Sequence, residues 1–291
     1  MLPPLSRKEV SDRIISNFKI PKSPPPSDFP LDVLKHMKKN ANPKLVIKLS
    51  KLNKYFIHEK CPFIYLGDNV DISNDSVSVW NQGRKNYKIN EIPNNLGIGR
   101  IFHVYYENLL PQLISKVVIC DLKYLYIYTD AKLSFNDFKF LTSSESFFKL
   151  GLYGKVVDED GIVPYETLLE NAPFLRHFSI GHSSPLHLTK RFFEKFTASN
   201  LEKLFLYDLT KFFDVEIFLN SMKKKPNLHI YFQFEESVDP GKVNAYIDKL
   251  VAADELDSRP PYFDYGFLDA ERRSQLRNLR NAYDLKIRGD G

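Results

Sequence analysis

Cysteine is scarce in this chain, and long apolar runs are missing. The two cysteines, Cys61 and Cys120, cannot by themselves form the disulfide framework of a small secreted domain or a zinc site. No apolar stretch approaches the roughly 18 residues that a membrane helix needs, and the opening MLPPLSRKEV lacks the apolar core of a signal peptide. These features predict a cytoplasmic or nuclear protein that has no membrane partner.

Motifs for catalysis and for cofactor binding are also missing. The chain has no glycine-rich phosphate loop with Gly-Lys-Ser/Thr, no His-Glu-x-x-His helix and no Gly-x-Ser-x-Gly elbow. His177, His182 and His187 lie close together in the sequence, but nothing supplies the fourth ligand that a zinc site usually has. The sequence therefore predicts no enzyme activity, no cofactor and no metal.

The composition is that of a folded protein with many aromatic side chains. The 291 residues include 16 Tyr and 23 Phe, and 43% of them are apolar, which disfavours extensive disorder. This length allows two domains, or one core with an appended module. The net charge of +5 permits an acidic partner but does not by itself indicate nucleic-acid binding.

Residues 29–56, FPLDVLKHMKKNANPKLVIKLSKLNKYF, predict two short helices. Val33, Leu34 and Met37 lie on one helical face, and Pro43 interrupts the pattern. A second amphipathic pattern runs over 45–56. Helices this short are not stable alone in water, so their apolar faces must pack against each other and against something else. The preceding residues 1–28, with three consecutive prolines, predict an extended tether.

This stretch resembles an F-box, the helical module that joins a substrate receptor to an SCF-type ubiquitin ligase. The opening Phe29-Pro30 stands for the family's Leu-Pro, Asn42-Pro43 lies at the family's turn, and Phe56 stands at its closing tryptophan. The resemblance implies that the SCF adaptor protein, and through it a cullin, is a partner. The implied adaptor contacts are Phe29, Pro30, Leu34, Met37, Pro43, Leu49 and Phe56.

Two alternatives remain open for the same stretch. It is also compatible with an ordinary helical hairpin inside a larger domain. Its many lysines could contact nucleic acid, but lysine runs are most often solvated, and the stretch lacks the arginines and interleaved aromatics of a nucleic-acid surface. The sequence therefore does not favour nucleic acid as a partner.

The second half of the chain repeats a short apolar frame. The segments LKYLYI, FFKLGL, LRHFSI and LEKLFL begin at residues 122, 147, 175 and 201, and a related segment, LHIYFQF, begins at 228. Helical patterns lie between them, over 134–144, 164–174, 189–199 and 215–227. A strand, a turn and a helix in about 26 residues is the spacing of leucine-rich repeats, whose units bury their apolar faces by stacking.

Residues 122–236 therefore resemble a divergent leucine-rich-repeat array. The family's asparagine position holds other residues, such as Lys155 and Leu209, which predicts an irregular solenoid. Divergent repeats follow F-boxes in one large class of receptors. The resemblance implies an α/β fold, a short helical F-box followed by an irregular leucine-rich-repeat-like solenoid, with Leu125, Leu150, Leu204 and Leu206 buried. The alternative is a single α/β domain with coincidental spacing.

The remaining strand positions alternate with these leucines and are expected on the open, concave face. Tyrosines are concentrated along one side of that face. Glycine and serine occupy its middle, where their small side chains are expected to leave a shallow depression. Exposed aromatics next to lysines are typical of protein-binding surfaces, although tyrosine also simply suits strands. The predicted target-binding residues are Tyr124, Tyr126, Tyr128, Tyr153, His177, Lys203, Phe205 and Tyr207.

The predicted organisation has five parts: a tether (1–28), the F-box-like module (29–60), a cap or atypical leading repeats (61–121), the repeat region (122–236), and a C-terminal helical cap and tail (237–291). Within 61–121 we expect strands over 61–72 and 76–89, and a helix followed by a strand over 100–120. A C-terminal helix is expected over 240–255, and residues 270–285 are expected to form either another helix or a loose tail. The predicted function is that of an SCF substrate receptor; the alternative is a repeat-based interaction scaffold without a ligase.

Overall fold

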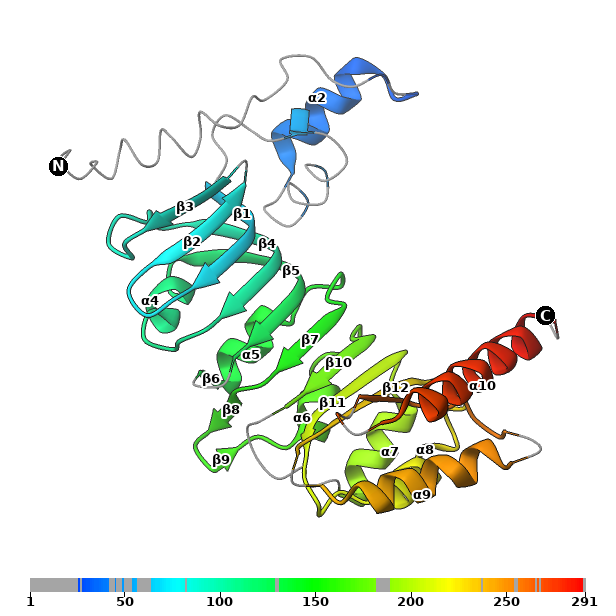
Figure 1. Cartoon of the computed structure of the whole chain (residues 1–291). Coiled ribbons are helices and arrows are strands. Elements are labelled where there is room, and N and C mark those ends of the chain that lie inside the picture. The colour runs from blue at the N-terminus through cyan, green and yellow to red at the C-terminus, as the bar shows by residue number, and fades with distance from the viewer. Residues whose placement is uncertain are drawn as a thin grey trace. The chain divides into compact units, whose positions relative to one another are not determined.

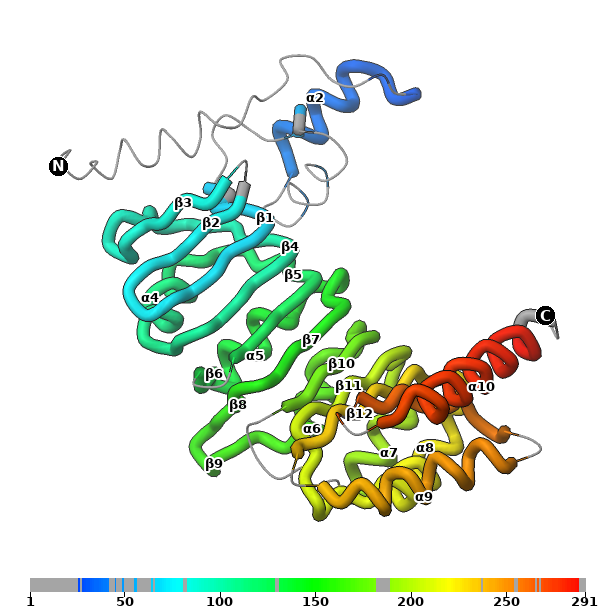
Figure 2. Tube along the Cα trace, viewed as in Figure 1, coloured from blue at the N-terminus to red at the C-terminus, as the bar shows by residue number. Residues whose placement is uncertain are grey.

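The computed structural model describes residues 26, 28–41, 45, 49, 54–56, 64–81, 83–128, 131–181, 189–236, 238–253, 256–264, 266 and 268–289 (Figures 1 and 2). Contacts divide the chain into two compact units, Met1–Leu122 and Lys123–Gly291. The fold is mixed α/β with a large, mostly parallel sheet. This confirms the α/β class that the sequence predicts.

A small helical cluster occupies the start of the N-terminal unit. Helix α2, Leu31–Asn40, begins after Pro30, whose carbonyl accepts a hydrogen bond from the amide of Leu34 at 3.2 Å. A single 3-10 turn, η1, follows at Lys54–Phe56. The first predicted helix is thus confirmed. Most of the second predicted helix, Pro43 and almost all of the predicted tether lie outside the described residues.

The rest of the N-terminal unit is built on β-strands. These are β1 (Ile64–Ile72), β2 (Val77–Asn81), β3 (Gly83–Tyr87) and β4 (Leu96–Val104), followed by helix α4 (Leu110–Ile114) and the first half of β5 (Val117–Ile127). β1 pairs in parallel with β4 and antiparallel with β2, and β2 and β3 form an antiparallel pair. Their alternate residues, such as Val70 and Phe102, are fully buried.

One prediction in this region is wrong. The helix expected from Arg100 onward is strand β4 up to Val104, and the helix is confined to Leu110–Ile114. The physical reason is a period-two pattern in which Phe102 and Val104 are buried while Ile101 and His103 are partly exposed. The apolar residues Leu109 and Leu110 further along made the whole segment resemble one helix.

Parallel strands follow one another in chain order in the C-terminal unit (Figure 1). After β5 come β7 (Lys149–Leu152), β10 (His177–Ile180), β11 (Lys203–Leu209), β12 (His229–Phe234) and β13 (Tyr262–Asp264), and each pairs in parallel with the one before it. A small second sheet consists of β6 (Lys132–Ser134), β8 (Lys155–Asp158) and β9 (Gly161–Ile162).

A helix lies in each connection between the main strands, as parallel pairing requires. These helices are α5 (Phe135–Leu141), α6 (Tyr165–Glu170), α7 (Lys190–Ala198), α8 (Val215–Met222) and α9 (Pro240–Val251). Side-chain oxygens cap the N-termini of several of them. Ser134, Thr189 and Asp214 accept hydrogen bonds from backbone amides at 2.9–3.1 Å. Such caps satisfy amides that have no partner within the helix, which sets where these helices begin.

The helices cover one face of the strands, and the repeated apolar frame supplies that face. Leu125, Leu150, Phe178, Leu204 and Ile230 lie in register across neighbouring strands. The four leucines predicted to be buried, Leu125, Leu150, Leu204 and Leu206, are each 0% exposed. Aromatic rings of α6 and α8 pack against the same face, through the pairs Tyr165–Phe178 and Phe218–Phe232. The predicted core register is therefore confirmed.

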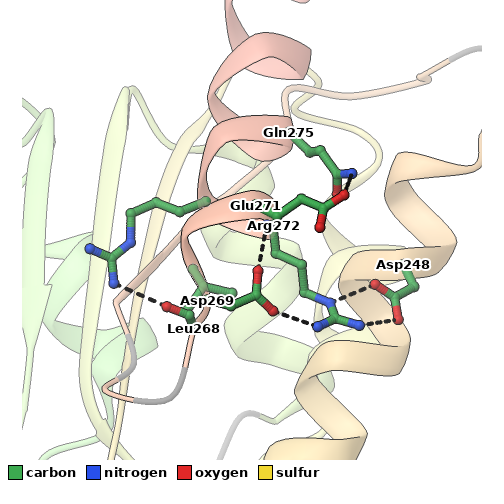
Figure 3. Close-up of polar contacts among 7 residues, drawn as sticks. Asp248, Leu268, Asp269, Glu271, Arg272 and Gln275 are labelled. Atoms are coloured by element: carbon green, nitrogen blue, oxygen red, sulfur yellow. Dashed lines mark hydrogen bonds and ion pairs between the residues drawn. The ribbon is translucent and has the colours of Figure 1, made fainter.

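The C-terminal segment adds one strand and a long helix. Strand β13 was not predicted, because its three residues are too few to show a period. Helix α10, Ala270–Gly289, was predicted and is joined to α9 by Arg272, which binds Asp248 through two hydrogen bonds of 2.7 and 2.8 Å (Figure 3). Asp269 accepts from the same guanidinium and from the Arg272 amide, which fixes the first turn of α10.

None of the helices in the described ranges is both long and apolar enough to span a lipid bilayer.

Candidate protein-binding face

Side chains of the parallel strands that turn away from the covering helices form one continuous face. Because successive residues of a strand point to opposite sides, this face carries the residues that alternate with the buried leucines. We call it the aromatic face, and it contains all eight predicted target-binding residues. Each of the eight is half-buried. The face consists of Tyr124, Tyr126, Tyr128, Lys149, Gly151, Tyr153, His177, Ser179, Gly181, Lys203, Phe205, Tyr207, His229, Tyr231 and Tyr262.

Aromatic rings contact one another from strand to strand across this face. The ring centres of Tyr128 and Tyr153 are 5.9 Å apart, and those of Tyr153 and Tyr207 are 5.6 Å apart. The path continues to Tyr231, at 5.6 Å from Tyr207, and to Tyr262, which stacks on Tyr231 at 5.1 Å. Strands β11, β12 and β13, and the residues that directly follow β5 and β7, thus contribute to one connected aromatic layer, held by ring contacts that each stabilise by about 0.5–1.5 kcal/mol.

Sequence reasoning missed the last two of these tyrosines. Tyr231 lies in the segment at 228, which aligns with a one-residue offset: His229, not Ile230, pairs with Lys203. Tyr262 lies in the unpredicted strand β13. The alternation of buried and outward-facing positions within LHIYFQF could have placed Tyr231 on the aromatic face. The sequence around Tyr262 has no comparable pattern.

The middle of the face differs from the expected low, open patch. Gly151, Ser179 and Gly181 are buried, and ring atoms of neighbouring tyrosines lie close to both glycines. A Cβ atom on Gly151 would lie 2.5 Å from Cδ1 of Tyr126, and one on Gly181 would lie 2.9 Å from Cδ1 of Tyr153. The small residues therefore leave room for these rings to pack against the sheet, which is why the tyrosines are half-buried rather than fully exposed.

Hydroxyl groups on the face are joined by hydrogen bonds. The Tyr153 hydroxyl is hydrogen-bonded to Ser179 and to Tyr207, and Tyr231 donates to Asp264. Burial, and then the neighbouring Tyr207, raises the pKa of Tyr153 well above its ordinary value. Burial, and then the bond to Asp264, raises the pKa of Tyr231 in the same direction. The phenols are thus neutral at physiological pH and do not oppose an approaching anion.

Cations line the same face. The Lys149 ammonium lies 5.3 Å from the ring centre of Tyr126 and 5.8 Å from that of Phe205. At the other side, the Arg280 guanidinium of α10 lies 4.8 Å from the ring centre of Tyr262. These are cation–π distances, so the two charged groups are held against the aromatic layer.

The predicted adaptor residues are divided between the interior and the surface of the helical cluster. Leu34, Leu49 and Phe56 are each 5% exposed and pack together with Tyr55. Phe29 is 60% exposed. Pro30 is exposed, Met37 is partly buried against the cluster, and Pro43 is not among the described residues. Among the described residues of this part, the large apolar side chains that are exposed are Phe29, Leu31, Val33 and Leu45.

The N-terminal unit has a second group of polar and aromatic side chains. The Trp80 indole donates to Asp71 at 2.6 Å, and the imidazole of His103 stacks on Tyr105 with ring centres 6.0 Å apart. Burial lowers the pKa of His103, and Asp71 opposes that change. Across the part of the chain that the structure describes, no group of three or more His, Cys, Asp or Glu side chains could hold a metal ion. His182 and His187 lie outside that part.

Known proteins give no guide to this site. No family model matches the chain. Comparison with the curated proteins finds no significant similarity. The function is therefore argued from the geometry of the aromatic face and of the helical cluster.

Proposed function

We propose that this chain is a receptor that binds a target protein on the aromatic face and is linked to an SCF-type ubiquitin ligase through its N-terminal helical module. The observation that carries the proposal is the aromatic face itself. Parallel strands in register turn a connected layer of tyrosines away from the helices. Target selection is then this chain's task, and ubiquitin transfer belongs to a separate enzyme that is brought close to the target.

A protein target suits the chemistry of this face. Tyrosine offers a large apolar area with few rotatable bonds, so little conformational entropy is lost on binding. Half-burial and ring contacts hold Tyr126, Tyr153 and Tyr207 in place before a partner arrives. Aromatic residues and arginine are among the residue types enriched in protein interfaces.

The order of the strands supports a leucine-rich-repeat-like arrangement of 122–236. Each strand pairs in parallel with its predecessor in the chain, and each connection includes a helix on the same side. We therefore propose that this region is an irregular solenoid of the kind that follows F-boxes in receptor proteins. The missing asparagine ladder agrees with irregular turns: Leu209 is buried and Lys155 begins β8.

The helical module supports adaptor docking through its surface side chains. Phe29 and Leu31 are 60% and 50% exposed, which is unusual for large apolar residues on a small module. We propose that these two residues, with Pro30, form the adaptor contact. Leu34, Leu49 and Phe56 then act indirectly, because they hold the module together from inside.

One observation favours the alternative of a scaffold without a ligase. Three of the predicted contact residues, Leu34, Leu49 and Phe56, are interior, as they would be in a purely structural hairpin. In that case the aromatic face would still bind its target, and no adaptor would be recruited.

Adaptor binding by the full chain separates the two functions. The purified chain is titrated with the SCF adaptor, and a Phe29→Ala/Leu31→Ala variant is compared with Leu285→Ala, whose side chain is exposed on α10. Interface anchors cost about 2 kcal/mol or more on truncation, so the double variant should bind about thirtyfold more weakly, and the control should bind normally. If the parent chain does not bind the adaptor, the scaffold function stands instead.

A further inference from the structure

Basic side chains from four neighbouring strands form a row at the N-terminal ends of the strands. Register pairs Lys149 with His177, His177 with Lys203, and Lys203 with His229. Strands lie about 4.8 Å apart, so the row is about 14 Å long. Arg259 extends it, because its guanidinium lies 2.7 Å from Nε2 of His229. We call these five residues the cationic row.

The acids nearest to the row are already engaged with arginines. Glu202 pairs with Arg176, and Asp284 pairs with Arg259. At neutral pH the charge of the row comes from Lys149, Lys203 and Arg259, because the lowered pKa of His177 and of His229 leaves both imidazoles neutral. Its positive potential is therefore only partly neutralised from within the chain.

The pKa values of the two histidines reflect this positive potential. Burial and the charges of Lys203 and Lys149 lower the pKa of His177. Burial and the charges of Arg259 and Lys203 lower the pKa of His229. Glu202 opposes the change at both histidines, and Asp284 opposes it at His229. An anion bound on the row would raise the pKa of both histidines, which is opposite to the effect of the neighbouring lysines and arginine.

A depression of about 390 Å³ opens beside the row and is lined by Lys203, Lys225 and His229, with Glu202 also at its wall. The Lys225 ammonium donates to the backbone carbonyls of Ser199 and Leu201 at 2.6 and 2.9 Å. An ammonium has three donors, so one remains for a ligand. The hollow has room for one carboxylate or phosphate side chain.

We propose that the cationic row binds an acidic segment of the target protein, with aspartate, glutamate or phosphorylated side chains lying across the strands while its apolar residues contact the aromatic layer. This inference rests on the proposed function and names the chemistry of its target. A row of about 14 Å matches about four residues of extended chain. Lys149 belongs to both surfaces, because it lies in the row and contacts the rings of Tyr126 and Phe205.

The arrangement fits a peptide better than a nucleic acid. Single-stranded nucleic acid is held by aromatic rings that present open faces on which bases stack. Here the rings of Tyr126, Tyr153 and Tyr207 are half-buried against glycines and against one another, so part of the ring surface on which a base would stack is already covered. The short row also lacks the long basic track that follows a phosphate backbone.

Labelled peptides test the proposal directly. The full chain is titrated by fluorescence anisotropy with three fluorescein-labelled twelve-residue peptides that carry glutamate, phosphoserine or glutamine at the same positions. A labelled thymidine oligonucleotide serves as a fourth probe. We expect the glutamate or phosphoserine peptide to bind at least tenfold more tightly than the glutamine peptide, and the better of the two identifies the source of the anion.

A charge-matched pair of variants localises the binding. Lys149→Gln/Lys203→Gln should weaken binding of the acidic peptide at least tenfold, whereas Lys211→Gln/Lys242→Gln, with the same change of charge at exposed lysines, should not. Thermal unfolding checks that both variants are folded. Equal losses in the two variants, no preference for the acidic peptides, or tighter binding of the oligonucleotide would each overturn the proposal.

Capture of cellular partners separates failure of this inference from failure of the proposed function. If a partner is lost from Tyr126→Ala/Tyr207→Ala but kept by Lys149→Gln/Lys203→Gln, the aromatic face binds a target that is not acidic. In that case only the present inference fails. If neither variant loses any partner, the proposed function fails as well.

Discussion

Lys149 and Phe205 lie on strands β7 and β11, with β10 between them, yet the Lys149 ammonium is 5.8 Å from the centre of the Phe205 ring. The intervening strand allows this contact because it presents the small Ser179 in register with Phe205. Small residues on this face thus leave space in which larger side chains can make contact. They let side chains that are two strands apart meet, and they join the cationic row to the aromatic layer.

Gly154 should be intolerant of even a methyl group. A Cβ atom there would lie 2.4 and 2.5 Å from the backbone carbonyl oxygens of Ala131 and Tyr128, and backbone cannot move aside as a side chain can. Gly154→Ala should lower the free energy of unfolding by about 1–3 kcal/mol, measured by chemical denaturation. Gly266→Ala, where no atom lies within 4 Å of the added carbon, is the control. Equal stability of the two variants would contradict the described turn after β7.

Leu204 tests the apolar register of the repeat. It is 0% exposed and lies between Phe178 and Ile230 on the neighbouring strands. Leu204→Ala should cost about 2–5 kcal/mol, as buried leucines do. Leu285→Ala, at a side chain that is 69% exposed, should change stability by less than about 0.5 kcal/mol. A thermal midpoint for Leu204→Ala equal to that of the parent would show that the frame is misplaced.

The charge of Lys203 should affect the pKa of two histidines, His177 and His229. Its charge contributes to the lowered pKa of both His177 and His229. Lys203→Gln should therefore raise both pKa values, measured by NMR titration of the imidazole protons, whereas Lys211→Gln should leave them unchanged. If only one imidazole responds, the two histidines do not flank Lys203 as described.

The same histidines should make stability depend on pH in a defined direction. Each has a folded-state pKa below the unfolded value of about 6.5, so the unfolded chain binds more protons as the pH falls. Their contribution to stability is present above about pH 6.5 and is lost as the pH falls from there through the folded-state pKa. His177→Gln/His229→Gln should flatten the fall in thermal midpoint below pH 6.5. An unchanged slope would contradict the lowered pKa values.

Arg272 should hold α10 against α9. It binds Asp248 and Asp269 together (Figure 3), and these bonds lower the pKa of both carboxyl groups. Arg272→Gln should speed hydrogen exchange in the first turns of α10, whereas Arg277→Gln, at an exposed position of the same helix, should not. Unchanged protection in Arg272→Gln would show that the ends of the two helices are held by other contacts.

The register of the repeats could be predicted because two periods in the sequence indicated the same strand positions. The longer period of about 26 residues marked the strands, and the alternation within each strand marked which side was buried, so Leu125, Leu150 and Leu204 were placed correctly. Strand β4 was missed because the alternation that ends with Phe102 and Val104 is short and is soon followed by the apolar start of α4. Short strands such as β13 offer no period at all.

Side-chain exposure on the two candidate surfaces could not be predicted. An apolar helix face shows that Leu34 needs a partner, but not whether that partner is its own module or another protein. Likewise, alternation places Tyr126 and Tyr153 on the face opposite the leucines. It does not show that their rings pack against glycines, because that depends on which residue the next strand brings into register.

Photo-crosslinking from the aromatic face tests the central claim most directly. Benzoylphenylalanine is placed at Tyr126, or at Ile217 on the outer side of helix α8, where the side chain is 64% exposed. The full chain is expressed in cells and irradiated, and crosslinked partners are identified by mass spectrometry. We predict that position 126 captures a partner that position 217 does not. Capture of the same partners from position 217, with none from 126, would show that the target binds the helical side and not the aromatic face.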